Sequence, residues 1–308
     1  MVGLAVVLPV RIYLDELISK TKQYMKRLLI AITLVTFIVI CTSARKSVKA
    51  YTEEKLMDVA FGSFPSSKMD VYLPANRNAR TPFVILIHGG GWVLGDKSLD
   101  RPTEDTLLAH GIACANINYR FVDSLHTHYP EMLADIDSAV NYCIAHAGEW
   151  NTRKDNFITS GGSAGGRLCL LYGYTANKKI SAIIAECPPT DLTDTVMLNY
   201  ATKIGLQPVI EKMVGATYTR GQALAPQFAA SSPIYHIKNI PTLIVHGTAD
   251  KTVLYSQSVA FDKVLTSKNI THKFISIPGA DHDCNLKDPA TRTMVYKEIV
   301  DWALKYGK

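Results

Sequence analysis

The chain has 308 residues, 47% hydrophobic and 19% charged, a composition that excludes a disordered chain, a collagen-like repeat and a small disulfide scaffold. Its formal net charge of +6 belongs to the first 50 residues, which hold eight Lys or Arg against two acidic residues, because the remaining 25 basic and 25 acidic residues cancel. A neutral body removes the main support for nucleic-acid binding, so we expect no nucleic-acid partner.

The N-terminal segment has the pattern of a secretory signal peptide. Lys26 and Arg27 precede an apolar run from Leu28 to Cys41, and small residues follow up to Ala44. The run has 14 residues, whereas a membrane span usually needs roughly 18 or more. We therefore predict an exported protein, periplasmic or secreted, with cleavage after Ala44.

Two alternatives would keep the protein at the membrane, facing outside the cytoplasm. Lipidation of Cys41 would need a small residue before it, where this chain has the bulky Ile40. The other alternative is a leader retained as an anchor. Because residues 1–24 would make the leader unusually long, we expect Met25 to be the true start, and residues 1–44 are not used to predict the fold.

From about residue 50 to residue 308, apolar runs alternate with helix-like stretches, which is typical of a parallel sheet with crossover helices. The run FVILI at 83–87 is continuously apolar, as expected of a strand buried on both faces. The pattern predicts one domain with strands at 83–87, 113–117, 157–159, 182–185, 242–245 and 273–277 and helices at 129–147, 167–174, 259–265 and 293–306.

This alternation breaks between residues 187 and 240. The segment contains five prolines and two short helix-like pieces, so we predict a small cap inserted over the sheet rather than a separate domain. Its aromatic residues Tyr200, Tyr218 and Phe228 either line a pocket or simply pack the cap onto the sheet.

The cysteines give little information about function. Without Cys41 five remain, most of them in apolar runs where buried thiols are common. An odd number cannot all pair within the chain, and the sequence leaves open whether Cys284 forms a disulfide. No Cys/His spacing resembles a zinc site, so we expect no metal.

A glycine-rich turn follows the strand expected at 157–159. Residues 161–166 read Gly-Gly-Ser-Ala-Gly-Gly, with Ser163 between the glycines. A serine on a sharp strand-to-helix turn needs such neighbours because the tight backbone leaves no room for side chains. The N-terminus of the following helix favours developing negative charge. The pattern predicts a nucleophilic serine, with an ordinary glycine-rich turn as the alternative.

A second cluster, His88-Gly89-Gly90-Gly91-Trp92, follows the strand expected at 83–87. Glycines at the end of a buried strand let backbone N–H groups approach a carbonyl oxygen and stabilise negative charge on it. The alternative is a flexible loop, which the G-x-S-x-G sequence downstream disfavours.

A nucleophilic serine needs a base, and the base needs an orienting carboxylate. Asp250 and His282 each lie in the loop after a predicted strand, at the carboxyl edge where ligand sites of parallel sheets form. We predict these two as acid and base, with Asp281 as the rival acid, whose side chain should diverge from that of its neighbour His282. We expect His236 and His272 to be structural or solvated, and His88 and His246 to brace their loops through hydrogen bonds.

With these motifs assembled, the chain resembles the esterase and lipase branch of the α/β-hydrolase superfamily that is related to hormone-sensitive lipase and to bacterial acetylxylan and feruloyl esterases. The resemblance runs from MDVYLP at 69–74 through HGGGW, NYR, GGSAGG and HGTADKTV to the ADH loop at 280–282, and covers nearly all of residues 55–305. It implies an α/β-hydrolase fold, a mostly parallel central sheet flanked by helices.

The resemblance also assigns roles to particular residues. It implies Ser163 as nucleophile, Asp250 as acid and His282 as base, with no metal or organic cofactor. The oxyanion hole would be formed by the backbone N–H groups of Gly90, Gly91 and Ala164. The chain departs from the pattern at Arg167, where many relatives carry His or a small apolar residue.

The expected function is a serine carboxylesterase that hydrolyses short-acyl esters through an acyl-enzyme. A short cap and export point to small acyl groups on accessible alcohols, such as acylated plant polysaccharides. Arylformamidases share the H-G-G-x-W and G-x-S-A-G-G motifs and form one alternative, although they work in the cytosol. The other is a catalytically inactive hydrolase-fold binding protein.

Overall fold

The structure is a computed structural model that describes residues 7–43, 50–123 and 125–307. Its contacts divide the chain into two units, residues 1–50 and 51–308. The first contains helix α1 (Val7–Ser43), which includes the apolar run of the predicted signal peptide. The predicted cleavage point after Ala44 lies outside the described residues. Within the part of the chain that is described, no helix is both long and apolar enough to cross a membrane.

The second unit is built on one eight-stranded sheet with the order β1-β2-β4-β3-β5-β6-β7-β8. Strand β2 pairs antiparallel with β1 and β4, and all other pairs are parallel, which confirms the expected mostly parallel sheet. The strands are β1 (Glu54–Ala60), β2 (Lys68–Leu73), β3 (Phe83–Ile87), β4 (Ala113–Ile117), β5 (Phe157–Gly162), β6 (Ile180–Glu186), β7 (Thr242–Gly247) and β8 (His272–Ile277).

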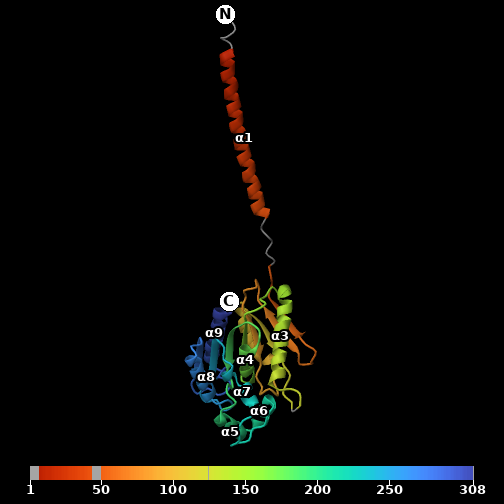
Figure 1. Ribbon diagram of the computed structural model, residues 1–308, viewed down its shortest axis with the longest axis vertical. Helices are drawn as coiled ribbons and strands as arrows, with labels where there is room; N and C mark the ends of the chain where they lie inside the picture. Colours follow the sequence, from red (N-terminus) through yellow and green to blue (C-terminus); the bar gives the residue numbers. More distant parts are fainter. Residues whose placement is uncertain (1–6, 44–49, 124, 308) are drawn as a thin grey trace. The chain divides into compact units, whose positions relative to one another are not determined.

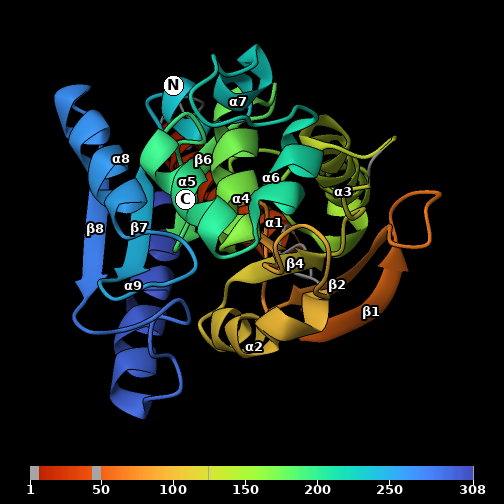
Figure 2. The ribbon, with the colours of Figure 1, turned by 90° about the horizontal axis from the view of Figure 1, so that it is seen from below.

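Helices cover both faces of this sheet (Figure 2). Alternate residues of β3 explain why both faces need cover: Phe83, Ile85 and Ile87 join one apolar cluster, whereas Val84 and Leu86 join the other. The first cluster includes residues of α3 (Tyr129–Trp150), α4 (Ala164–Thr175) and α8 (Ser256–Ser267), and the second includes residues of α2 (Arg101–Ala109) and α9 (Pro289–Tyr306).

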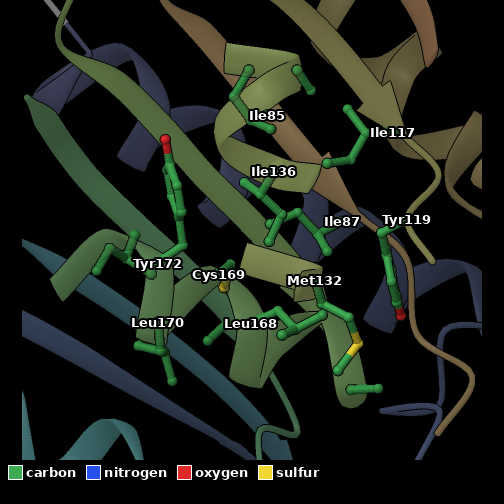
Figure 3. Close-up of a cluster of buried hydrophobic side chains, with 14 of the residues drawn as sticks. Ile85, Ile87, Ile117, Tyr119, Met132, Ile136, Leu168, Cys169, Leu170 and Tyr172 are labelled. Atoms are coloured by element: carbon green, nitrogen blue, oxygen red, sulfur yellow. The ribbon is translucent and has the colours of Figure 1, made fainter. Parts of the chain in front are cut away.

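Figure 3 shows the first cluster where α3 and α4 lie against the sheet. Met132 and Ile136 of α3 and Leu168 of α4 belong to this cluster together with Ile85 and Ile87 of β3, and all five are buried. Burial of these side chains, at about 1.5–3 kcal/mol each, anchors α4 on the sheet. The start of α4 is thereby held at the carboxyl ends of the central strands.

The cap between β6 and β7 gathers at one end of the sheet (Figure 1). It contains α5 (Thr195–Lys203), α6 (Gln207–Val214), α7 (Pro226–Ala230) and a 3₁₀ turn (Pro233–Tyr235). The prediction of two short helices is therefore wrong for this described segment. Pro208 and Pro226 begin helices rather than interrupt them, because proline fits the first turn, where its missing N–H is not needed.

Candidate active site

Ser163 lies alone on the turn between β5 and α4. Its φ of 54° falls in the left-handed region, which is strained for a residue with a side chain. A Cβ added to Gly165 would lie 1.9 Å from the carbonyl oxygen of Ile87, so this position requires glycine. The predicted end of the strand at residue 159 and the predicted start of the helix at residue 167 are wrong. The glycines on either side of Ser163 belong to β5 and α4, which run to residue 162 and from residue 164.

The structure brings the three predicted side chains into one hydrogen-bonded row. The Nε2 atom of His282 lies 2.8 Å from the Oγ atom of Ser163, and its Nδ1 atom lies 2.7 Å from Oδ2 of Asp250. An imidazole that donates from Nδ1 to a carboxylate leaves Nε2 free to accept the proton of a hydroxyl. The row can therefore withdraw a proton from the serine.

Asp250 is buried and accepts hydrogen bonds at both oxygens. Oδ1 accepts from the N–H groups of Thr252 and Val253 at 2.7 and 2.9 Å, and Oδ2 accepts from His282 and His246. Burial alone would raise the pKa of Asp250, but the hydrogen bonds from the two histidines and from the Thr252 N–H hold that pKa well below its usual value. Asp250 is therefore a carboxylate at neutral pH.

Asp281, the alternative candidate for the acid, accepts hydrogen bonds from the backbone rather than from the His282 imidazole. Its Oδ1 accepts from the backbone N–H groups of Lys251 and His282 at 3.0 and 2.8 Å. These two hydrogen bonds lower the pKa of Asp281 and bridge the loops after β7 and β8. The carboxylate braces the backbone that carries His282 rather than its imidazole.

The other histidines have structural partners. Nε2 of His246 faces two acceptors, Asp250 Oδ2 at 3.0 Å and the Val253 carbonyl at 3.1 Å, so it carries the proton, and Nδ1 accepts from the Ser258 hydroxyl at 2.7 Å. His88 is buried and stacks on Tyr119, and burial lowers its pKa. Farther away, His236 contacts the Ala230 carbonyl and His272 contacts Asp262.

The predicted oxyanion-hole residues line the same cavity as Ser163 and His282. Gly90 has a φ of 117°, and a Cβ there would lie 2.0 Å from the Leu94 carbonyl oxygen, so only glycine fits. The indole N–H of Trp92 donates to the Ala164 carbonyl at 3.1 Å and ties the glycine loop to the start of α4. Ala164 is the first residue of α4, a position whose N–H has no partner within a helix. The backbone N–H of Ser163 itself donates to the backbone carbonyl of Glu186 at 2.7 Å.

An apolar cavity of about 380 Å³ extends from Ser163 beneath the cap. The cap contributes aliphatic side chains to its wall: Leu192, Met197, Leu206, Val209 and Ile210. The aromatic residues considered as lining are not in this wall. Tyr218 and Phe228 are buried in the core cluster, and the hydroxyl of Tyr200 donates to the Lys251 carbonyl at 2.7 Å. Packing is thus the correct alternative for Tyr218 and Phe228, whereas Tyr200 ties α5 to the loop after β7.

A second, more polar cavity of about 240 Å³ is also lined by Ser163 and His282. Its wall includes the acidic residues Asp100 and Glu186. Burial raises the pKa of Asp100 to about 6, and burial together with the charge of Asp100 raises that of Glu186 to about 7. Sequence reasoning missed this cavity. The available signal was an acidic residue, Glu186, at the end of the otherwise apolar β6.

Arg167 holds the cap to α4. Its side chain is fully buried, donates to the Ser231 carbonyl after α7 and to Met213 Sδ in α6, and lies 5.5 Å from the Trp92 ring. Burial lowers the pKa of this guanidinium to about 9. The position at which the chain departs from the family pattern therefore connects α4, two cap segments and the glycine loop.

One group of three potential metal ligands occurs among the described residues: Cys187, Asp250 and His282, whose ligand atoms lie within 4.8 Å of one another. Asp250 and His282 are hydrogen-bonded to each other, so the atoms that an ion would need are already paired.

Known proteins resemble this chain in sequence and in fold. A family model described as BD-FAE matches residues 69–265, which are 197 of the 308 residues. The esterase LipC of Mycobacterium tuberculosis is 26% identical over 245 residues, which are 75% of this chain and 60% of that protein. The chain thus spans about three fifths of the length of this curated relative.

Two solved structures share the fold. A truncated carbohydrate esterase from gut microbiota has a TM-score of 0.67 and 22% identity, over 84% of this chain and 98% of that chain. The propionate-bound esterase Est2 from the planctomycete Thermogutta terrifontis has a TM-score of 0.64 and 20% identity, over 83% of this chain and 94% of that chain. These similarities show the α/β-hydrolase fold.

Proposed function

Because the chain belongs to the BD-FAE family and has the α/β-hydrolase fold, we propose that it is a serine carboxylesterase. The observation that carries this proposal is the row of hydrogen bonds from Ser163 through His282 to Asp250, with separations of 2.8 and 2.7 Å. A serine, a base and an orienting carboxylate at these distances are the minimal set for nucleophilic acyl transfer. Relatives that are named esterases add support.

In the proposed reaction, Ser163 attacks the ester carbonyl while His282 accepts the serine proton at Nε2. Asp250 holds the Nδ1–H tautomer and stabilises the imidazolium that forms. His282 then gives the proton to the leaving alcohol, which departs and leaves an acyl group on Ser163. Water, deprotonated by the same imidazole, releases the acid and restores the enzyme.

The oxyanion of each tetrahedral intermediate would accept hydrogen bonds from the backbone N–H groups of Gly90, Gly91 and Ala164. The rigid glycine loop, tied to α4 by Trp92, supports this role because preorganised donors cost no reorganisation during the reaction. Loss of one such donor costs about 2.7–4 kcal/mol of transition-state stabilisation in related chemistry.

The two cavities suggest how a substrate is divided between them. The apolar cavity beneath the cap suits the acyl group, and its 380 Å³ lies within the usual range of small-molecule sites. The polar cavity suits an alcohol that bears further hydroxyl groups, because a carboxyl group accepts hydrogen bonds when ionised and donates one when protonated. We therefore propose that the substrates are acyl esters of carbohydrates. One of the structural relatives is described as a carbohydrate esterase, which supports this substrate class.

The test is hydrolysis of p-nitrophenyl acetate, butyrate and octanoate beside an arylformamide by the purified chain. Ser163→Ala and His282→Ala should each lower kcat by roughly 10⁴-fold or more. Ser138→Ala, on the exposed face of α3, is the matched control and should leave kcat unchanged.

Two results would overturn the proposal. Formamide cleavage far above ester cleavage would identify an amide hydrolase. Ester turnover that persists in Ser163→Ala would remove the serine from the mechanism.

A further inference from the structure

Two cysteines meet beside the candidate active site without a part in its hydrogen bonds. Cys187 directly follows β6, and Cys284 lies two residues after His282. Their Sγ atoms are 3.0 Å apart although 97 residues separate them in sequence, and both side chains are buried.

We propose that Cys187 and Cys284 form a disulfide that ties the end of β6 to the loop carrying His282. The bond forms by thiol–disulfide exchange with an external small-molecule disulfide such as oxidised glutathione. One thiolate attacks that disulfide and displaces one equivalent of thiol, and the second thiolate then displaces another. Two protons and two electrons leave the protein, and the external disulfide is reduced to two thiols.

The two Sγ atoms already lie close to bonding distance. A disulfide needs a sulfur separation of about 2.0 Å, so the two Sγ atoms must approach by about 1 Å. Both residues lie outside helices and strands, with φ values of 45° and 51°. The approach therefore starts from residues outside regular elements, although the N–H of Cys187 donates to the Val245 carbonyl of β7 at 2.8 Å.

The remaining cysteines of the second unit are held inside regular elements. Cys114 lies in β4, Cys143 in α3 and Cys169 in α4. The thiol of Cys169 donates to the carbonyls of Gly166 and Ile184 at 3.1 and 3.3 Å. The pairing that the geometry favours is therefore specific, and it accounts for two of the five cysteines that follow residue 50.

Exchange should require a transient opening of this region. The contact with Cys284 and burial raise the pKa of Cys187, so its thiol stays protonated, whereas the thiolate is the species that attacks. Oxidation is thus expected while the chain folds, or in mild denaturant that opens the loops.

The experiment uses the full chain, treated with oxidised glutathione in a series of sub-denaturing urea concentrations, alkylated and digested with trypsin without reduction. Cleavage after Lys179, Lys203, Lys273 and Lys287 yields peptides 180–203 and 274–287, each with one cysteine. We expect a linked pair with a mass two hydrogens below the sum. Because the bond closes a long loop, we also expect the Tm to rise by about 5 °C or more and to fall again on reduction.

Cys187→Ala and Cys284→Ala should abolish both the linked pair and the redox-dependent Tm, whereas the control Cys143→Ala should keep them. The proposal is wrong if Cys187 and Cys284 are accessible to the alkylating reagent in urea but both are always recovered as alkylated peptides after treatment with oxidised glutathione. A link from either peptide to another cysteine would also overturn it. Neither readout uses a substrate, so the result is independent of the proposed esterase activity.

Discussion

At the scale of single residues, the carboxylates of Asp250 and Asp281 have different roles: the first orients the imidazole of His282, and the second holds the backbone of its loop. Asp250 contacts the imidazole of His282, whereas Asp281 accepts only backbone N–H groups among its hydrogen bonds within the described residues. We predict that Asp250→Asn lowers kcat by about 10⁴-fold because the amide stabilises the wrong tautomer. Asp281→Asn should change kcat by less than about tenfold. Equal losses in steady-state assays would contradict this assignment.

Glu186 should make stability depend on pH. Its pKa of about 7 lies above its ordinary value of 4.5, so the folded state binds its proton more tightly, and the stability it contributes is lost as the pH rises from about 4.5 through 7. We predict that Glu186→Gln melts a few degrees above the wild type at pH 8 and that the gap closes by pH 4.5. Thermal melts across this range test it, with the exposed Glu149→Gln as control. A gap independent of pH would refute the account.

The residues of the hydrogen-bonded row could be predicted from the sequence, whereas the acidic residues of the polar cavity could not. Ser163, Asp250 and His282 follow the ends of recognisable strands, and parallel strands bring such ends to one edge. Glu186 lies beside the site because β6 pairs with β5, with Glu186 opposite Gly162, whereas Asp100 comes to it only through the packing of the turn before α2. No periodic pattern encodes that packing.

At the scale of elements, the continuously apolar strands in the middle of the sheet could be predicted from the sequence, whereas the strands at its β1 edge could not. Strands β3 and β4 are buried at every residue and have the predicted bounds. Strand β1 is exposed along most of its length, so its apolar residues show no strong pattern and it was missed. Strand β2 is buried from Met69 to Leu73, but Asp70 interrupts its apolar run, and it was missed together with α2.

The cap helices should determine which acyl chains fit. Val209 of α6 lines the apolar cavity, whereas Val196 of α5 is exposed and outside its wall. We predict that Val209→Trp lowers kcat/KM for p-nitrophenyl octanoate at least tenfold more than for the acetate, because the indole takes up cavity volume that only the longer acyl chain needs. Val196→Trp should leave the ratio unchanged. An unaltered chain-length preference in Val209→Trp would exclude the cavity as the acyl site.

At the scale of the whole molecule, the first 50 residues and the remainder form separate units, and all of the net charge belongs to the first. We propose that this leader directs export and is then removed. Intact-mass analysis of protein produced with its leader in an exporting host should give a chain that begins at Arg45. A chain that keeps Met25 or an acyl group on Cys41 would instead support membrane attachment.

The central claim is that Ser163 is an activated nucleophile, and covalent labelling tests it most directly. A fluorophosphonate probe should attach one equivalent to the wild type, on the tryptic peptide 155–167 and at Ser163 within it. Ser163→Ala should remain unlabelled, and His282→Ala should react far more slowly because the serine loses its base. If the wild type is labelled no faster than Ser163→Ala, the hydrogen-bonded row does not activate the serine and the esterase proposal is wrong.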